Sequence, residues 1–184
     1  MTRKLIDLVK TLIPQFMKTI ILSAAFFWIT NLSNYSISQV DSLLIQNNIP
    51  NWVKPILEKS EMAQKHQILT DFNPFYFEQD FTGDNQADIA FFVENKIDKT
   101  KGVMIINNVK NLVYVIGCGT ATDMGVSLSW TKRWFIYRSR YIMNDGNKKK
   151  ITLKYPAIQL IRSETNSLVI YWNGKKYKTF IQQS

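Results

Sequence analysis

The chain has 184 residues, of which 46% are hydrophobic and 20% charged, and its formal net charge is +9. Its single cysteine, Cys118, excludes an intramolecular disulfide, and its single histidine, His66, excludes a zinc site made of histidine and cysteine ligands. Any catalytic pair or triad that needs a histidine would have to use His66, which lies in a different segment from Cys118 and is expected in a partly exposed loop.

Residues 19–29 form a continuous apolar stretch that is too short to cross a hydrocarbon layer of about 30 Å as a helix. Basic residues precede or flank it at Arg3, Lys4, Lys10 and Lys18. Small residues in Ser36-Ile37-Ser38 stand where a signal peptidase reads them, just before Gln39. The pattern predicts a signal peptide over residues 1–38 and an exported protein, in the periplasm, on the cell surface or secreted. An uncleaved membrane anchor is one alternative, and a start at Met17, with residues 1–16 as an extension, is another.

Cleavage after residue 38 leaves 184 − 38 = 146 residues, which is the size of one ordinary domain with its own core. We therefore predict a single β-rich domain over residues 39–184, without a membrane span. Its first part, residues 40–65, has helical spacing of apolar residues, and Pro50 and Pro55 divide it into two short helices.

After Pro74 the sequence changes to short runs of β-branched and aromatic residues between polar turns, which is typical of antiparallel strands. The predicted fold class is mainly β, an antiparallel β-sandwich or a curved sheet with two short N-terminal helices; α+β is the alternative. The runs are 75–78, 88–94, 102–106, 112–116, 151–153, 157–163, 168–172 and 175–180. Residues 112–116 are apolar throughout and are expected to form a central strand.

Asn173-Gly174 is a strong signal for a two-residue hairpin turn. Such a turn would pair Trp172 with Lys175 and Ile170 with Tyr177. The last strand would then expose one charged side and lie at a sheet edge.

Residues 80–88 carry the most specific pattern in the chain. Oxygen-bearing side chains recur at alternate positions, and this is the arrangement that a hard cation such as Ca²⁺ needs. The expected ligands are Asp80, Thr82, Asp84 and Asp88, together with the main-chain carbonyl of Gln86. A metal-free acidic turn that precedes a strand is the alternative interpretation.

The loop resembles the calcium loop of FG-GAP and VCBS type repeats, whose pattern is close to Asp-x-Asn-Gly-Asp-Gly-x-x-Asp followed by a strand. The resemblance covers about a dozen residues in one copy, and it implies calcium as a cofactor of an exported protein. Thr82 replaces the usual Asn or Asp, and Asn85 replaces a glycine. Asn tolerates the left-handed conformation of that turn position, so the turn is compatible with this sequence.

Charge is unevenly distributed along the predicted domain. Residues 39–98 carry 4 basic and 10 acidic residues, whereas residues 99–184 carry 15 basic and 3 acidic residues. Such a basic half attracts anionic partners, for example an envelope polymer or an acidic protein; nucleic acid is not the expected partner. Alternatively, the two halves pair with one another across the fold.

Residues 130–141 interleave aromatic and basic residues. Strand alternation would place Trp134, Arg138 and Arg140 on one face. This face is the candidate ligand-binding face; contact with solvent or with carboxylates of the acidic half is the alternative. Gly117-Cys118-Gly119-Thr120 lacks the residues of a phosphate loop and a basic partner for the thiol, so we expect a tight strand exit.

No catalytic constellation is visible in the sequence. The first functional hypothesis is a secreted or periplasmic, non-enzymatic binding or structural domain with a calcium-stabilised loop. The second is a periplasmic inhibitor or immunity protein that binds an enzyme. The loop and the hairpin resemble those of bacterial lysozyme inhibitors, which favours this hypothesis. The basic half speaks against a lysozyme as the target, since lysozymes are usually basic. The third hypothesis is a glycan-acting enzyme.

Overall fold

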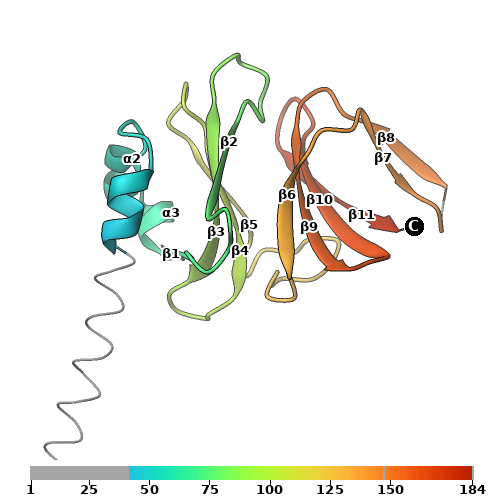
Figure 1. Ribbon diagram of the computed structural model, residues 1–184, viewed down its shortest axis with the longest axis horizontal. Helices are drawn as coiled ribbons and strands as arrows, with labels where there is room; N and C mark the ends of the chain where they lie inside the picture. Colours follow the sequence, from blue (N-terminus) through green and yellow to red (C-terminus); the bar gives the residue numbers. More distant parts are fainter. Residues whose placement is uncertain (1–41, 147, 184) are drawn as a thin grey trace, which may run out of the picture. The chain divides into compact units, whose positions relative to one another are not determined.

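The computed structural model describes residues 42–146 and 148–183 (Figure 1). The chain divides into two compact units, residues 1–48 and 49–184. The described part of the first unit is the helical segment 42–48, and the predicted signal peptide lies outside the described residues. Both β-sheets belong to the second unit.

Two short helices open the second unit; Pro50 lies between them and the helical segment 42–48, but the break between the two helices is at Ser60 and not at Pro55, where the sequence predicts it. Helix α2 covers Lys54–Lys59 with Pro55 in its first turn, and α3 covers Glu61–Gln64. Ser60 separates them, and its hydroxyl accepts a hydrogen bond from the main-chain N–H of Ala63 at 3.3 Å, which caps α3. Within the described residues, no helix has the length and apolar character needed to cross a membrane.

The first sheet is antiparallel throughout and has the order β1-β3-β4-β5, with β2 also pairing with β3. Its strands are β1 (His66–Ile68), β2 (Tyr76–Gln79), β3 (Asp88–Asn95), β4 (Lys101–Ile106) and β5 (Val113–Gly117). Strand β3 is buried on both faces along most of its length, and both its edges are paired, with β4 on one side and with β1 and β2 on the other.

The second sheet has the order β6-β9-β10-β11-β7-β8. Its strands are β6 (Arg133–Tyr137), β7 (Tyr141–Asn144), β8 (Lys149–Thr152), β9 (Ala157–Ser163), β10 (Asn166–Trp172) and β11 (Tyr177–Gln183). All pairs are antiparallel except β11 with β7, which meet in parallel at Gln183 and Asn144.

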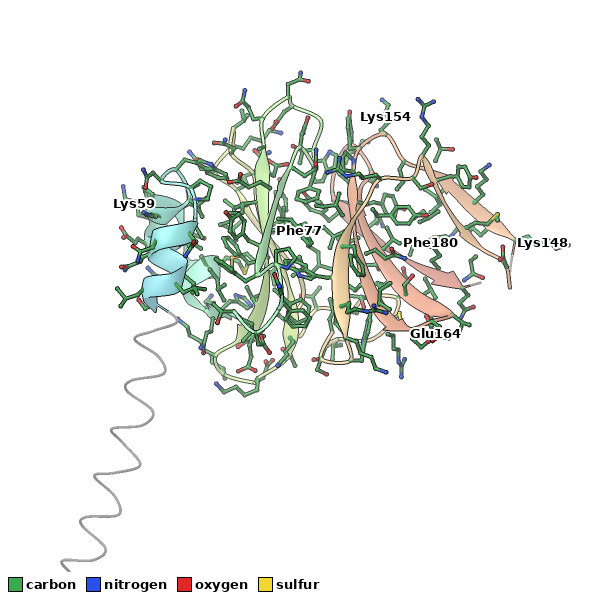
Figure 2. All side chains as sticks on the ribbon, in the orientation of Figure 1. Lys59, Phe77, Lys148, Lys154, Glu164 and Phe180 are labelled. Carbon is green, nitrogen blue, oxygen red and sulfur yellow. The ribbon has the colours of Figure 1, made fainter. Side chains whose placement is uncertain are left out.

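The main core lies between the two sheets, which confirms the mainly β prediction in its sandwich form (Figure 1). Both sheets contribute buried residues: Phe81, Ala90, Phe92, Val103, Ile105, Leu128, Trp134, Ile158, Leu160, Leu168 and Ile170. Each fully buried large side chain of this kind contributes about 1.5–3 kcal/mol relative to an exposed one. A smaller core around Ile142 and Phe180 covers the other face of the second sheet (Figure 2).

Several sequence predictions need correction, and three of them concern the position or burial of strand residues. Strand β5 is an edge strand with half-buried residues, although its apolar run predicted a central one. His66 begins β1 and is buried, with Nδ1 2.7 Å from the carbonyl oxygen of Met62, so it is not a loop residue. Strand β11 is covered at its C-terminal end by β7 and therefore does not form the edge of its sheet.

The last hairpin has a different register from the predicted one. Trp172 pairs with Tyr177, and Ile170 pairs with Thr179. The side chain of Asn173 explains the shift, because its Oδ1 accepts hydrogen bonds from the main-chain N–H groups of Lys175 and Lys176 and moves the turn one residue on. A change of two residues in pairing keeps each side chain on its predicted face.

Candidate functional site

The 80–88 loop is organised by the carboxylate of Asp80. Its two oxygens accept main-chain N–H bonds from Gly83, Asp84 and Asn85 at 2.5, 3.1 and 3.0 Å. Gly83 and Asn85 have left-handed φ angles of 78° and 65°, so the turn that the sequence predicts is present. The loop is anchored below by Phe81, whose side chain lies in the main core.

Three of the predicted ligands meet at one point, and that point is occupied by a side-chain nitrogen. Asn107 Nδ2 lies 3.0 Å from Thr82 Oγ1, 2.9 Å from Asp84 Oδ2 and 2.8 Å from Asp88 Oδ1. Its Oδ1 accepts a hydrogen bond from the main-chain N–H of Lys110 at 2.7 Å. This bond fixes the orientation of the amide, because a flipped amide would bring an oxygen against two carboxylates.

The two carboxylates of this cluster differ in acidity. Burial raises the pKa of Asp88 above its ordinary value, and hydrogen bonds from Thr82, Asn108 and Phe81 do not fully offset it. Burial also acts to raise the pKa of Asp84, but hydrogen bonds from Asn107, Gln86 and Thr82 outweigh it, so this pKa is lowered. Asp88 is fully buried and is the residue that depends most on its donors.

The loop has the chemistry of a calcium site, but its geometry satisfies the ligands without a cation. Asp80 uses both oxygens on main-chain N–H groups, and the amide of Asn107 fills the point where Thr82, Asp84 and Asp88 converge. Within the described ranges, no three His, Cys, Asp or Glu side chains gather in a group that would hold a metal. Gln86 donates its main-chain N–H to Asp84 Oδ1 at 3.0 Å. Calcium therefore stays a prediction, and its binding requires the Asn107 amide to turn away.

Asn107 and Tyr155 are the loop partners that sequence reasoning missed. Asn107 looked like a turn residue, yet the pairing of Ile89 with Ile106 in β3 and β4 places the next residue opposite Asp88. Pairing the two predicted strands across the 95–101 turn in the sequence would have placed Asn107 opposite Asp88. Tyr155, in the segment between β8 and β9, packs its ring on Gly83. No local sequence pattern predicts this contact.

The predicted ligand-binding face of residues 130–141 is not assembled. Trp134 is 2% exposed, packs against Phe77 with ring centroids 4.6 Å apart and donates its Nε1–H to the carbonyl of Pro74. Because it is a core residue, it offers no surface to a ligand. Strand β6 ends at Tyr137, so the alternation does not extend to Arg138 and Arg140. Both arginines are exposed, and Arg138 donates to Gln79 Oε1 at 3.2 Å.

A cleft of about 1030 Å³ lies beside the second sheet and the edge of the first. We call it the β5–β11 groove. Its walls come from β5, from residues 120–123, from the β7–β8 hairpin and from β11. Three lysines line it, Lys149, Lys176 and Lys178, and all three are exposed. Its acidic member, Asp123, accepts a hydrogen bond from Thr179 Oγ1 at 2.9 Å. The groove is therefore basic on balance.

One end of the groove is aromatic. Tyr114 of β5 lies edge-on to Tyr177 and Trp172, with ring centroids 5.2 and 5.8 Å apart. The Tyr177 hydroxyl is buried, and among the described residues it has no hydrogen-bond partner. Burial and then the charge of Asp88 raise the pKa of Tyr177, so this hydroxyl keeps its proton and remains a donor.

Cys118 is a structural residue, as expected for a tight strand exit. Gly117, Cys118 and Gly119 all have positive φ angles, and the buried thiol lies 3.8 Å from the carbonyl of Val93. Burial raises the pKa of Cys118 to about 12. The thiolate that reacts is thus scarce at neutral pH.

We expect Cys118 to be inert in the folded domain. At pH 8 a thiol reagent should modify it at least about 100-fold more slowly in native buffer than in denaturant, because the thiol is both protonated and buried. Absorbance of the released reagent measures both rates. Equal rates would show an accessible thiol and contradict this assignment.

The fold and the groove define a two-sheet β domain with a basic cleft along one sheet edge. Comparisons with protein-family models, with curated proteins and with solved structures gave no match.

Proposed function

We propose that the chain is an exported, non-enzymatic binding domain and that the β5–β11 groove holds an anionic partner. The observation that carries the proposal is the groove itself, which joins three exposed lysines to an aromatic end. Its volume is in the range of sites that bind a specific ligand. Two ion pairs are local: Lys65–Glu61 joins residues four apart, and Lys99–Glu94 lies at the β3–β4 turn, where the acidic half meets the basic half.

The groove favours binding over catalysis. Glycoside hydrolysis uses two facing carboxylates, and Asp123, the acidic residue that lines the groove, is already hydrogen bonded to Thr179. An inhibitor or immunity protein is the second candidate function. The observation that favours it is the open edge of β5 along the groove, since a sheet edge is suited to another protein chain.

We further propose that the 80–88 loop stabilises the domain and binds calcium by displacing the amide of Asn107. The two carboxylates and one hydroxyl around that amide are oxygen donors of the kind calcium prefers. The amide is therefore an internal competitor of the cation, and we expect weak affinity.

Binding of a defined polyanion tests the groove. At low ionic strength the purified domain should bind polyglutamate or polyphosphate, and binding should weaken steeply as salt is added, because counterions are released on association. Replacing Lys176 and Lys178 with alanine should weaken binding about fivefold to tenfold. The control replaces Arg138 and Arg140, which lie outside the groove and should contribute less. Fluorescence anisotropy measures each affinity. No binding at low salt would refute the proposal.

A further inference from the structure

We propose that the partner segment in the β5–β11 groove is an extended, acidic peptide of another protein, which adds as a strand to the free edge of β5. This inference rests on the proposed function of the groove and names the partner and the mode of binding.

Strand β5 has the composition of an interior strand but the position of an edge strand. Val113, Tyr114, Val115 and Ile116 are apolar and only half-buried. On one side β5 pairs with β4, and within the described part of the chain no strand pairs with its other side. Natural sheets usually protect such an edge with lysine, proline or a bulge. Strand β5 has no lysine and no proline, so its open edge is suited to pairing with another strand.

The backbone of β5 presents the groups that an added strand needs. The hydrogen bond from Asn107 N–H to the Leu112 carbonyl marks a hydrogen-bonded pair at the start of the β4–β5 ladder. Hydrogen-bonded and non-hydrogen-bonded pairs alternate along an antiparallel ladder. The N–H and C=O groups of Val113 and Val115 therefore point away from β4, toward the side where a further strand would lie.

The charge of the groove selects the peptide. Lys149, Lys176 and Lys178 stand along the walls, and Lys149 Nζ lies 5.7 Å from the ring centroid of Phe180. Glutamate or aspartate side chains of an incoming strand would meet these ammonium groups. A second copy of this chain, paired through its own β5, would bring the same lysines and add repulsion. Charge complementarity thus favours an acidic partner over self-association.

Aromatic side chains give the groove apolar contacts. The ring of Tyr177 lines the groove, but its hydroxyl is buried on the main-core side of β11 and is not offered to the bound segment. The ring of Tyr114, which packs against Tyr177 and Trp172, offers apolar surface to the intervening side chains. Recognition would combine a main-chain ladder, which any sequence can form, with charge and aromatic contacts, which select the sequence.

A synthetic eight-residue peptide that alternates glutamate with valine is the probe. The purified domain should bind it at least about tenfold more tightly than the same peptide with lysine in place of glutamate. N-methylation of alternate residues, which removes one edge of hydrogen-bond donors, should weaken binding about tenfold when the methylated edge faces β5 and little when the other edge is methylated. Hydrogen exchange should show new protection at the amides of Val113 and Val115.

Variants separate the edge from the charge. Val115→Pro removes an outward-facing N–H, which an edge strand tolerates, and should abolish binding of the glutamate peptide. Lys176→Glu with Lys178→Glu should reverse the preference between the two peptides, and Lys175→Glu, in the hairpin turn outside the groove lining, is the matched control. Because protection of Val113 and Val115 is measured in the wild-type domain, a misfolded variant does not leave the question open.

The possible outcomes distinguish this inference from the proposed function. Binding of the peptide or of polyglutamate without protection of β5 would keep an anion-binding groove and overturn strand addition. Equal binding of the glutamate and lysine peptides would overturn the acidic partner. Protection of β5 that increases with protein concentration alone would show a second copy at this edge and overturn the peptide partner. If neither the peptides nor the polyanions bind, the proposed function itself fails.

Discussion

Replacing Asn107 with alanine should lower the free energy of unfolding by about 2–4 kcal/mol, because the substitution removes a donor shared by two carboxylates and leaves the buried Asp88 with fewer hydrogen-bond donors. Urea denaturation followed by tryptophan fluorescence measures the change. Asn108→Ala is the matched control. The main-chain N–H of Asn108 bonds Asp88 Oδ1 at 3.3 Å and is retained in alanine, so this variant should lose less than about 0.5 kcal/mol. Equal losses in the two variants would contradict the central role of the amide.

The loss at Asn107 should also depend on pH. Without the amide, the folded-state pKa of both Asp84 and Asp88 should rise. A group whose folded-state pKa is raised destabilises the fold above that pKa, and the penalty is relieved as the pH falls through it toward the unfolded value. The stability difference between Asn107→Ala and the wild type should therefore shrink between about pH 7 and pH 4. A constant difference would mean that the variant acts through packing.

Calcium-dependent melting provides a second test of the role of Asn107. In several millimolar calcium the wild-type melting temperature should rise by about 3–6 °C over chelator, from a gain of about 1.4 kcal/mol at tenfold the dissociation constant. Asn107→Asp replaces the competing amide by a further carboxylate, so it should be less stable in chelator and gain more from calcium than the wild type. Asp84→Ala should remove the calcium-dependent part. Identical melts with and without calcium in all three proteins would leave a metal-free turn closed by Asn107.

The sequence predicted those features that short-range patterns decide. The 80–88 turn was predictable because Asp80, Gly83 and Asn85 supply the side-chain acceptor and the two left-handed positions within six residues. The helical character of this region and the start of α2 at Pro55 were predictable, whereas the break at Ser60 between α2 and α3 was not predicted. The mainly β class followed from strand-sized apolar runs separated by polar turns, but the sequence left a sandwich and a curved sheet as alternatives.

Features that depend on distant residues were not predictable. The apolar run of β5 predicts a central strand, but the path of the following chain decides whether a strand is central. After Gly119 the chain continues into the second sheet and adds no further strand beside β5. Asn107 meets Asp88 across 19 residues of sequence, through the strand register. Trp134 has the alternation of a surface strand, and only the packing of Phe72 and Phe77 against it shows that it is a core residue.

Gly83→Ala should be among the most destabilising single-methyl changes in the domain, because a Cβ at this position would lie 1.9 Å from a ring carbon of Tyr155. Gly83 also has a φ of 78°, which disfavours any side chain. Strain and clash together should cost about 2–4 kcal/mol. Gly174→Ala is the control for strain alone, since Gly174 has a φ of 94° and no atom within 4 Å of its added Cβ; it should cost only about 1 kcal/mol.

A double-mutant cycle separates the clash from the strain. In the Tyr155→Ala background the obstructing ring is absent, so Gly83→Ala should cost about 1–2 kcal/mol less than in the wild type. Urea denaturation of the four proteins gives the coupling energy. Such coupling would show that the loop of the first sheet and the segment before β9 support one another, so that a cation or substitution that reshapes the loop is felt in the second sheet as well. Additive losses would instead mean that Tyr155 moves aside freely, and the effect of Gly83→Ala should then equal that of Gly174→Ala.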